Sequence, residues 1–154
     1  MTSSRIVYPK VPLALGLAGL APFLGLAAAL ILGVVPPGFA DADSVRIALA
    51  GYGVAILSFL GGVRWGVALK VEEGAHGKAG RDFVISVIPP LIGWFAWFQP
   101  SPADLWWLAA AHLALGLLDY GLACRTLVDE WFGRLRLLLS AVAAASLALA
   151  ALLG

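Results

Sequence analysis

The stretch GYGVAILSFLGGVRWGVALK, residues 51–70, decides the fold because it is a hydrophobic run that carries an arginine inside it. An apolar run of about 20 residues is long enough to cross a bilayer as a helix. An ionisable side chain inside such a run is costly to bury and is often functional. Arg64 therefore needs a partner, which must come from another hydrophobic run.

The composition of the chain indicates an integral membrane protein. Of its 154 residues, 62% are hydrophobic and 12% are charged, whereas about 25% are charged in typical soluble domains. No polar stretch is long enough to form a soluble domain, so we expect a single membrane domain over residues 1–154. The net charge of +1, without a basic stripe, argues against nucleic-acid binding.

Five apolar runs predict an all-α bundle of five transmembrane helices. The expected spans are residues 11–35, 45–68, 83–98, 103–124 and 134–153. The first run is longer than the apolar core of a signal peptide, about 7–15 residues, so we expect it to be retained. Pro89 and Pro90 should interrupt the short third span. Either neighbouring helices and Ser86 satisfy the freed backbone groups, or the break borders a ligand cavity.

The connections between the spans are predicted to be short. Residues 36–38, Pro-Pro-Gly, should end the first span, and Asp41 and Ser44 should cap the second helix. We expect the glycine-rich residues 71–81 to form a solvated loop and residues 125–133 a short amphipathic connection.

Small residues follow helical spacing along the second span. They are Gly51, Ala55, Ser58, Gly62 and Gly66. This stripe predicts close packing against another helix or another membrane protein. Arg64 lies on a different face, so one face of the helix can pack while the other presents the charge.

The distribution of basic residues predicts the orientation in the membrane. With a cytoplasmic N-terminus, nine of the ten Lys and Arg residues fall on the cytoplasmic side, and Arg46 is the exception. Five spans then place the C-terminus outside.

Asp119 is the acidic residue predicted to pair with Arg64. Arg64 precedes Lys70 by six residues, and Asp119 precedes Arg125 by six. At 1.5 Å per residue, both lie about 9 Å inside the basic edge of their helices. We therefore predict an ion pair that joins the second and fourth spans. The alternative is that Arg64 extends to the lipid headgroups and needs no protein partner.

His112 shares a helix face with Asp119, seven residues later. A histidine in an apolar bundle is commonly a hydrogen-bonded packing residue. The alternative is a polar track of His112, Asp119 and Arg64 that suits a quinone head group, an anionic lipid or a proton. The other candidates for this cluster are Trp65, Ser86, Pro89 and Pro90.

The sequence offers no pattern for catalysis. It has no set of metal-ligating residues, no nucleophile with a general acid and base, and no phosphate-binding loop. We expect no enzyme activity, no cofactor and no metal site.

Four stretches resemble a known membrane family. They are VPLALGLAGLAPF at 11–23, YGVAILSFLGGVRWG at 52–66, SVIPPLIGW at 86–94 and RLRLLLS at 134–140. Together they resemble the family catalogued as domain of unknown function 3429. The resemblance implies a small multi-pass protein of a bacterial inner membrane or its mitochondrial descendant, and it implies no activity.

These observations predict a non-catalytic accessory or assembly factor, or a binder of a small hydrophobic ligand such as a lipid or quinone. The expected partners are membrane lipids and a quinone or another membrane protein. The alternative is a small transporter or channel that uses the track of Arg64, Asp119 and His112. A cavity between the second, third and fourth spans would favour ligand binding, and a filled bundle with an exposed small-residue groove would favour assembly.

Overall fold

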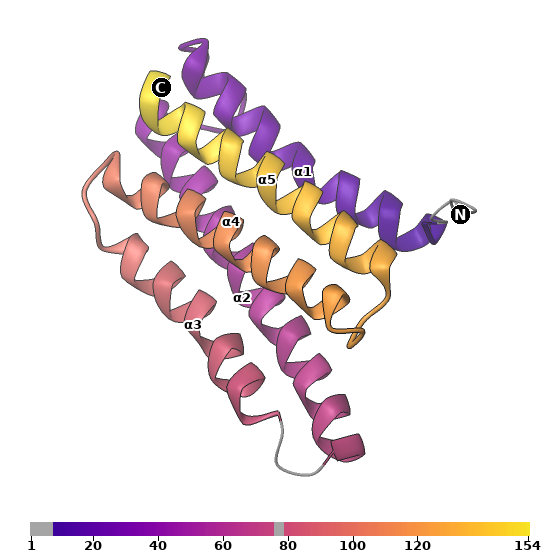
Figure 1. Ribbon diagram of the computed structural model, residues 1–154. Coiled ribbons are helices and arrows are strands. Elements are labelled where there is room, and N and C mark those ends of the chain that lie inside the picture. Colours follow the sequence, from indigo (N-terminus) through magenta and orange to yellow (C-terminus); the bar gives the residue numbers. More distant parts are fainter. Residues whose placement is uncertain (1–7, 76–78) are drawn as a thin grey trace.

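The computed structural model describes residues 8–75 and 79–154, and the side chains of residues 73–75 are not described. It contains five helices: α1 (Lys10–Ile31), α2 (Ala42–Ala75), α3 (Gly80–Trp97), α4 (Ala103–Cys124) and α5 (Glu130–Leu153). They form one elongated bundle, in which α4 lies between α3 and α5 and α1 packs beside α5 (Figure 1). The predicted all-α, five-helix architecture is confirmed.

Several helix ends differ from the prediction. α4 has the expected bounds, but α1 ends at Ile31 and α5 already begins at Glu130. α2 continues to Ala75, so the loop predicted at 71–81 is wrong for residues 71–75. Glu72 explains part of this difference, because its Oε2 accepts a hydrogen bond from the backbone N–H of Ala79 at 3.1 Å. Residues 76–78 of that predicted loop lie outside the described residues, and residues 80 and 81 belong to the first turn of α3.

Among the described residues, four helices are long and apolar enough to cross a membrane: α1, α2, α4 and α5. α3 is not one of them. Its first turn carries Arg81 and Asp82, which lower its mean hydropathy. Asp82 is nevertheless buried, so the protein and not lipid surrounds this charge.

The predicted cap of the second helix is confirmed. Asp41 Oδ1 accepts a hydrogen bond from the backbone N–H of Ser44 at 2.8 Å, and Ser44 Oγ accepts one from the N–H of Asp41 at 3.1 Å. Such reciprocal bonds satisfy donors that the helix itself leaves unpaired. They fix where the chain turns from α1 into α2.

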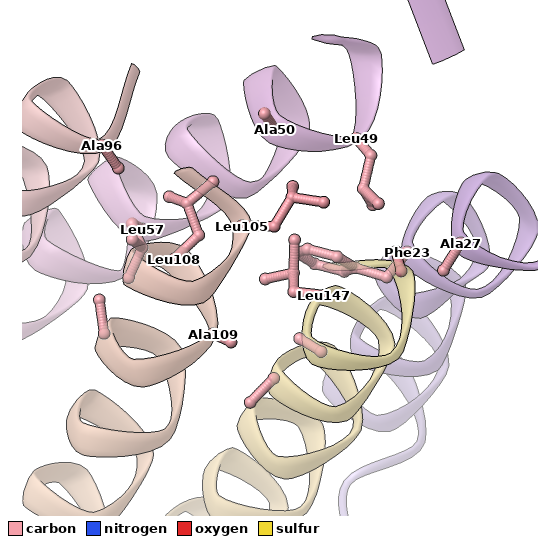
Figure 2. Packing of buried hydrophobic residues seen from close by; sticks show 14 of the residues in the cluster. Phe23, Ala27, Leu49, Ala50, Leu57, Ala96, Leu105, Leu108, Ala109 and Leu147 are labelled. Carbon is pink, nitrogen blue, oxygen red and sulfur yellow. The ribbon is translucent and has the colours of Figure 1, made fainter. Parts of the chain in front are cut away.

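An apolar core fills one half of the bundle. Figure 2 shows Phe23 of α1, Leu49 of α2, Leu105 and Leu108 of α4 and Leu147 of α5 gathered there. Each of these side chains is no more than 1% exposed. The buried charged residues described below lie in the other half of the bundle, toward the last turns of α2 and α4.

The predicted interruption at Pro89 and Pro90 is wrong, because α3 runs through both prolines. α2 covers this segment at Gly61, where an added Cβ would lie 2.5 Å from the carbonyl oxygen of Ser86 and 2.9 Å from Cδ of Pro90. The hydroxyl of Ser86 donates to the carbonyl of Phe83 at 2.6 Å. The proline segment therefore packs against a neighbouring helix and does not line the apolar pocket described below.

The stripe of small residues on α2 does not pack as predicted within this chain. Gly51 contacts the ring of Trp97, but the other four members are exposed: Ala55, Ser58, Gly62 and Gly66. The face that packs is the one that carries Arg64, because the charge finds its partners on α3 and α4. Pairing of buried charges therefore outweighs the small-residue pattern in orienting α2.

Gly61 should be far less tolerant of a side chain than Gly62. Gly61→Ala should lower the free energy of unfolding by about 1–3 kcal/mol, because the new methyl group collides with the backbone of α3. Gly62 has no atom within 4 Å of an added Cβ, so Gly62→Ala should be neutral or stabilise by about 0.5–1 kcal/mol. Thermal unfolding in mild detergent measures both, and equal stability of the two variants would contradict this packing.

Candidate functional site

The predicted ion pair between α2 and α4 is present. Arg64 Nη1 donates to Asp119 Oδ1 at 3.0 Å. Both residues are only 3% exposed, so Arg64 does not extend to the surface. This contact was predicted correctly from the sequence, because the two residues lie equally far from the basic ends of their helices.

Two further buried residues complete the cluster. Arg64 Nη2 donates to Asp82 Oδ1 at 2.9 Å, and Arg136 donates to Asp119 Oδ2 through Nε at 3.0 Å and Nη2 at 2.8 Å. The half-exposed Arg125 lies 3.6 Å from Asp82 Oδ2. These five residues, which we call the arginine–aspartate network, join α2, α3, α4 and α5.

The sequence interpretation missed Asp82 and Arg136 for identifiable reasons. Asp82 lies at the border of the region assigned to a loop, and Arg136 was counted with the basic edge of the last span. A usable signal exists on α5, where Arg136, Ser140 and Ala143 share one face. A buried carboxylate has acceptor capacity for two guanidinium groups, so Asp119 could have been assigned a second partner.

The network contains three guanidinium groups and two carboxylates. Removing one partner from a buried ion pair leaves an uncompensated charge, which costs about 3–5 kcal/mol. Asp119 uses one oxygen for Arg64 and the other for Arg136. It therefore fixes α4 relative to both α2 and α5.

An apolar pocket of about 460 Å³ lies between α1, α2 and α5. Its walls include Val11, Leu15, Phe59, Val63, Leu135 and Leu139. Val11, Leu15 and Phe59 are among the exposed apolar residues, so the pocket opens at the side of the bundle. Figure 1 shows the first turns of α1 diverging from the last turns of α2 on this side. On the sequence alone, a cavity between the second, third and fourth spans would have favoured ligand binding, and this pocket lies between α1, α2 and α5 instead.

Three polar residues contribute to the wall of this pocket: His112 of α4 and Arg136 and Ser140 of α5. His112 Nδ1 bonds to the carbonyl of Leu108 at 2.9 Å, and Phe23 packs edge-on against its ring. Of the five buried side-chain atoms without a hydrogen-bond partner among the described residues, two belong to residues that line this pocket, His112 Nε2 and Ser140 Oγ. The pocket therefore has an apolar body and unsatisfied polar atoms in the residues that line it.

The structure separates the predicted polar cluster into two groups. Arg64 and Asp119 belong to the network, and His112 belongs to the pocket. Arg136 links the two groups because it pairs with Asp119 and also lines the pocket.

The remaining predicted members of the cluster lie elsewhere. Trp65 is exposed and packs edge-on against Phe83, with ring centroids 4.8 Å apart. Ser86 and Pro89 are buried on α3, and Pro90 packs against Gly61. None of these four candidates lines the apolar pocket or pairs with the network in the described parts of the chain.

Asp119→Asn should lower the free energy of unfolding by about 3–5 kcal/mol, because it leaves both Arg64 and Arg136 without their shared carboxylate. Adding Arg64→Gln should restore part of this loss, with a coupling of about 0.5–3 kcal/mol. Restoration should be incomplete because Arg136 still lacks its partner.

Thermal or chemical unfolding of the single and double variants in detergent gives these values. The matched control is Asp43→Asn at an exposed aspartate in the first turn of α2, which should change stability by less than about 1 kcal/mol. Strictly additive effects of the two network substitutions would show that the ion pair contributes nothing.

Comparisons with known proteins agree with the architecture. The family described as "Protein of unknown function (DUF3429)" matches residues 8–152. Transmembrane protein 69 of Xenopus tropicalis is 38% identical over an alignment of 144 positions that covers 90% of this chain and 53% of the relative, so the chain spans about half of that relative's length. No solved structure matches the chain. The chain therefore belongs to the DUF3429 family and is a helical, multi-pass membrane protein.

Proposed function

We propose that the protein binds one small hydrophobic ligand, such as a lipid or quinone, in the apolar pocket between α1, α2 and α5. The observation that carries this proposal is a pocket of about 460 Å³ whose lining residues include two with unpartnered buried polar atoms, His112 and Ser140. Sites for small ligands typically measure about 300–1,000 Å³ and combine apolar walls with a few polar groups. The protein acts without catalysis of its own.

The proposed location is a bacterial inner membrane, with five spans, a cytoplasmic N-terminus and an external C-terminus. The nine-to-one distribution of basic residues supports this orientation. α3 packs along α2 and also contacts α4. This packing supports the proposal that α3 crosses the membrane as well, although it is not one of the four helices identified above as long and apolar enough to do so. In this orientation the arginine–aspartate network lies on the cytoplasmic side.

The mouth of the pocket suits entry from the lipid. Val11, Leu15 and Phe59 are 68%, 69% and 65% exposed, and in a bilayer these side chains would contact acyl chains. A ligand dissolved in the inner leaflet could then enter sideways between α1 and α2 without crossing a polar surface. The paired charges of the network support a structural role for Arg64 and Asp119, because each guanidinium and each carboxylate in it has an ion-pair partner among the described residues.

A role as an accessory or assembly factor is a second candidate. The exposed small residues of α2 favour it: Ala55, Ser58, Gly62 and Gly66. Small residues let another helix approach closely in lipid. Gly62→Leu should then remove a copurifying membrane protein while leaving the ligand pocket intact.

Filling the pocket should abolish ligand retention. Gly19 lines the pocket and has only the hydroxyl of Tyr52 within 4 Å of an added Cβ, at 3.8 Å. Gly19→Leu should therefore fold and occupy the space. Gly25→Leu is the matched control on the same helix, because Gly25 is exposed and has nothing within 4 Å.

Native mass spectrometry after purification in mild detergent measures ligand retention directly. The wild type and Gly25→Leu should retain one hydrophobic molecule, and Gly19→Leu should lose it. Equal retention by Gly19→Leu, or no retained molecule in the wild type, would overturn the assignment of this pocket as a ligand site.

A further inference from the structure

We infer that the ligand carries a hydroxyl group, an alcohol or a phenol, which donates a hydrogen bond to Nε2 of His112. This inference rests on the proposed function and narrows its ligand class. It favours a hydrophobic alcohol or a quinol over a quinone, an ester or a fatty acid.

The carbonyl of Leu108 determines the tautomer of His112. Nδ1 lies 2.9 Å from this oxygen, and a carbonyl oxygen can only accept a hydrogen bond. Nδ1 must therefore carry the proton. A neutral imidazole has one N–H group, so its Nε2 presents a lone pair and is an acceptor. A charged ring would add a fourth cation to a region where three arginines already face two aspartates.

The surroundings of His112 supply no donor to this lone pair. Nε2 is buried without a partner in the described structure. Two groups that pack against the ring are apolar: the ring of Phe23 lies edge-on at 5.3 Å between centroids, and a Cβ on Gly53 would lie 3.8 Å from Cε1. A buried acceptor without a donor is unfavourable, so this atom favours a ligand that donates.

Ser140 provides the complementary half of the site. It belongs to the same pocket, and its Oγ is likewise buried and unpartnered. A Cβ on Gly116, one helical turn after His112, would lie 2.8 Å from this oxygen. The two unpartnered atoms therefore belong to the facing helices α4 and α5, on residues that line the same pocket. A ligand oxygen that lies against Ser140 can accept a hydrogen bond from its hydroxyl.

Arg136 makes an anionic head group less suitable. Its Nε and Nη2 both donate to Asp119 Oδ2, so its charge is already offset. A carboxylate or phosphate in the apolar pocket would have to compete with Asp119 for this cation. A neutral hydroxyl needs no such exchange.

The test uses two pairs of probe compounds, and the two members of each pair differ only in whether they carry a hydroxyl group that can donate a hydrogen bond. The first pair is dodecan-1-ol and its methyl ether, and the second is 4-heptylphenol and its methyl ether. Each is titrated by calorimetry into the full chain in nanodiscs, with protein-free nanodiscs as the partition blank. The hydroxyl compound of at least one pair should bind wild type about tenfold more tightly than its ether, since one hydrogen bond is worth about a factor of ten.

The two pairs also distinguish the sources of the hydroxyl. A preference confined to the dodecanol pair indicates an aliphatic alcohol, and one confined to the heptylphenol pair indicates a phenolic ring such as a quinol. His112→Phe should reduce the affinity of the hydroxyl compound to that of the ether and leave the ether unchanged. Ser140→Ala should reduce the preference about two- to fivefold.

Ser146→Ala is the matched control. The hydroxyl of Ser146 donates to the carbonyl of Val142 at 2.9 Å and is not part of the pocket wall, so this variant should bind like wild type. If ether and hydroxyl bind equally to wild type in both pairs, or if the preference survives in His112→Phe, the hydroxyl inference is wrong while the pocket remains a ligand site. If no probe binds above the blank, the proposed function itself fails.

Discussion

The buried carboxylate of Asp119 is the constraint on which the rest of this structure depends. It lies between two guanidinium groups, with Arg64 on one oxygen and Arg136 on the other. Each of these groups would be unfavourable alone in an apolar interior. Together they hold three helices in one relative position, and Asp82 extends the same pairing to α3. The apolar half of the bundle adds stability by burying side chains such as Leu108 and Leu147. Apolar contacts of this kind tolerate several relative positions of the helices, whereas the buried ion pairs tolerate few.

The position of the pocket follows from this arrangement. Arg136 is turned toward Asp119, and this rotation of α5 brings Ser140 against α4 at Gly116. α1 then packs along α5, where an added Cβ on Gly16 would lie 2.7 Å from Leu139. α2 is held by its own pairs with α3 and α4, and it contacts α1 through the hydrogen bond from the Tyr52 hydroxyl to the carbonyl of Gly19. The space left between them is lined by apolar side chains and becomes the pocket.

Part of this arrangement could be predicted from the sequence. The number of helices and the pair of Arg64 with Asp119 followed from the hydrophobic runs and the fixed rise per residue. The unbroken α3 did not, because its prolines are covered by Gly61 of another helix. Arg136 and the pocket were missed for a related reason. Both depend on which helices become neighbours, and a small-residue stripe such as that of α2 does not specify its partner.

Solid-state NMR of the protein in lipid bilayers tests the central claim most directly. With ¹³C in aspartate carboxyl groups and ¹⁵N in arginine side chains, dipolar recoupling reports which carboxyl carbons lie next to guanidinium nitrogens. The Asp119 signal, identified by its loss in Asp119→Asn, should be strongly dephased by arginine nitrogen. The dephasing should weaken in Arg64→Lys and again in Arg136→Lys. An Asp119 signal that shows no dephasing in the wild type would contradict the account.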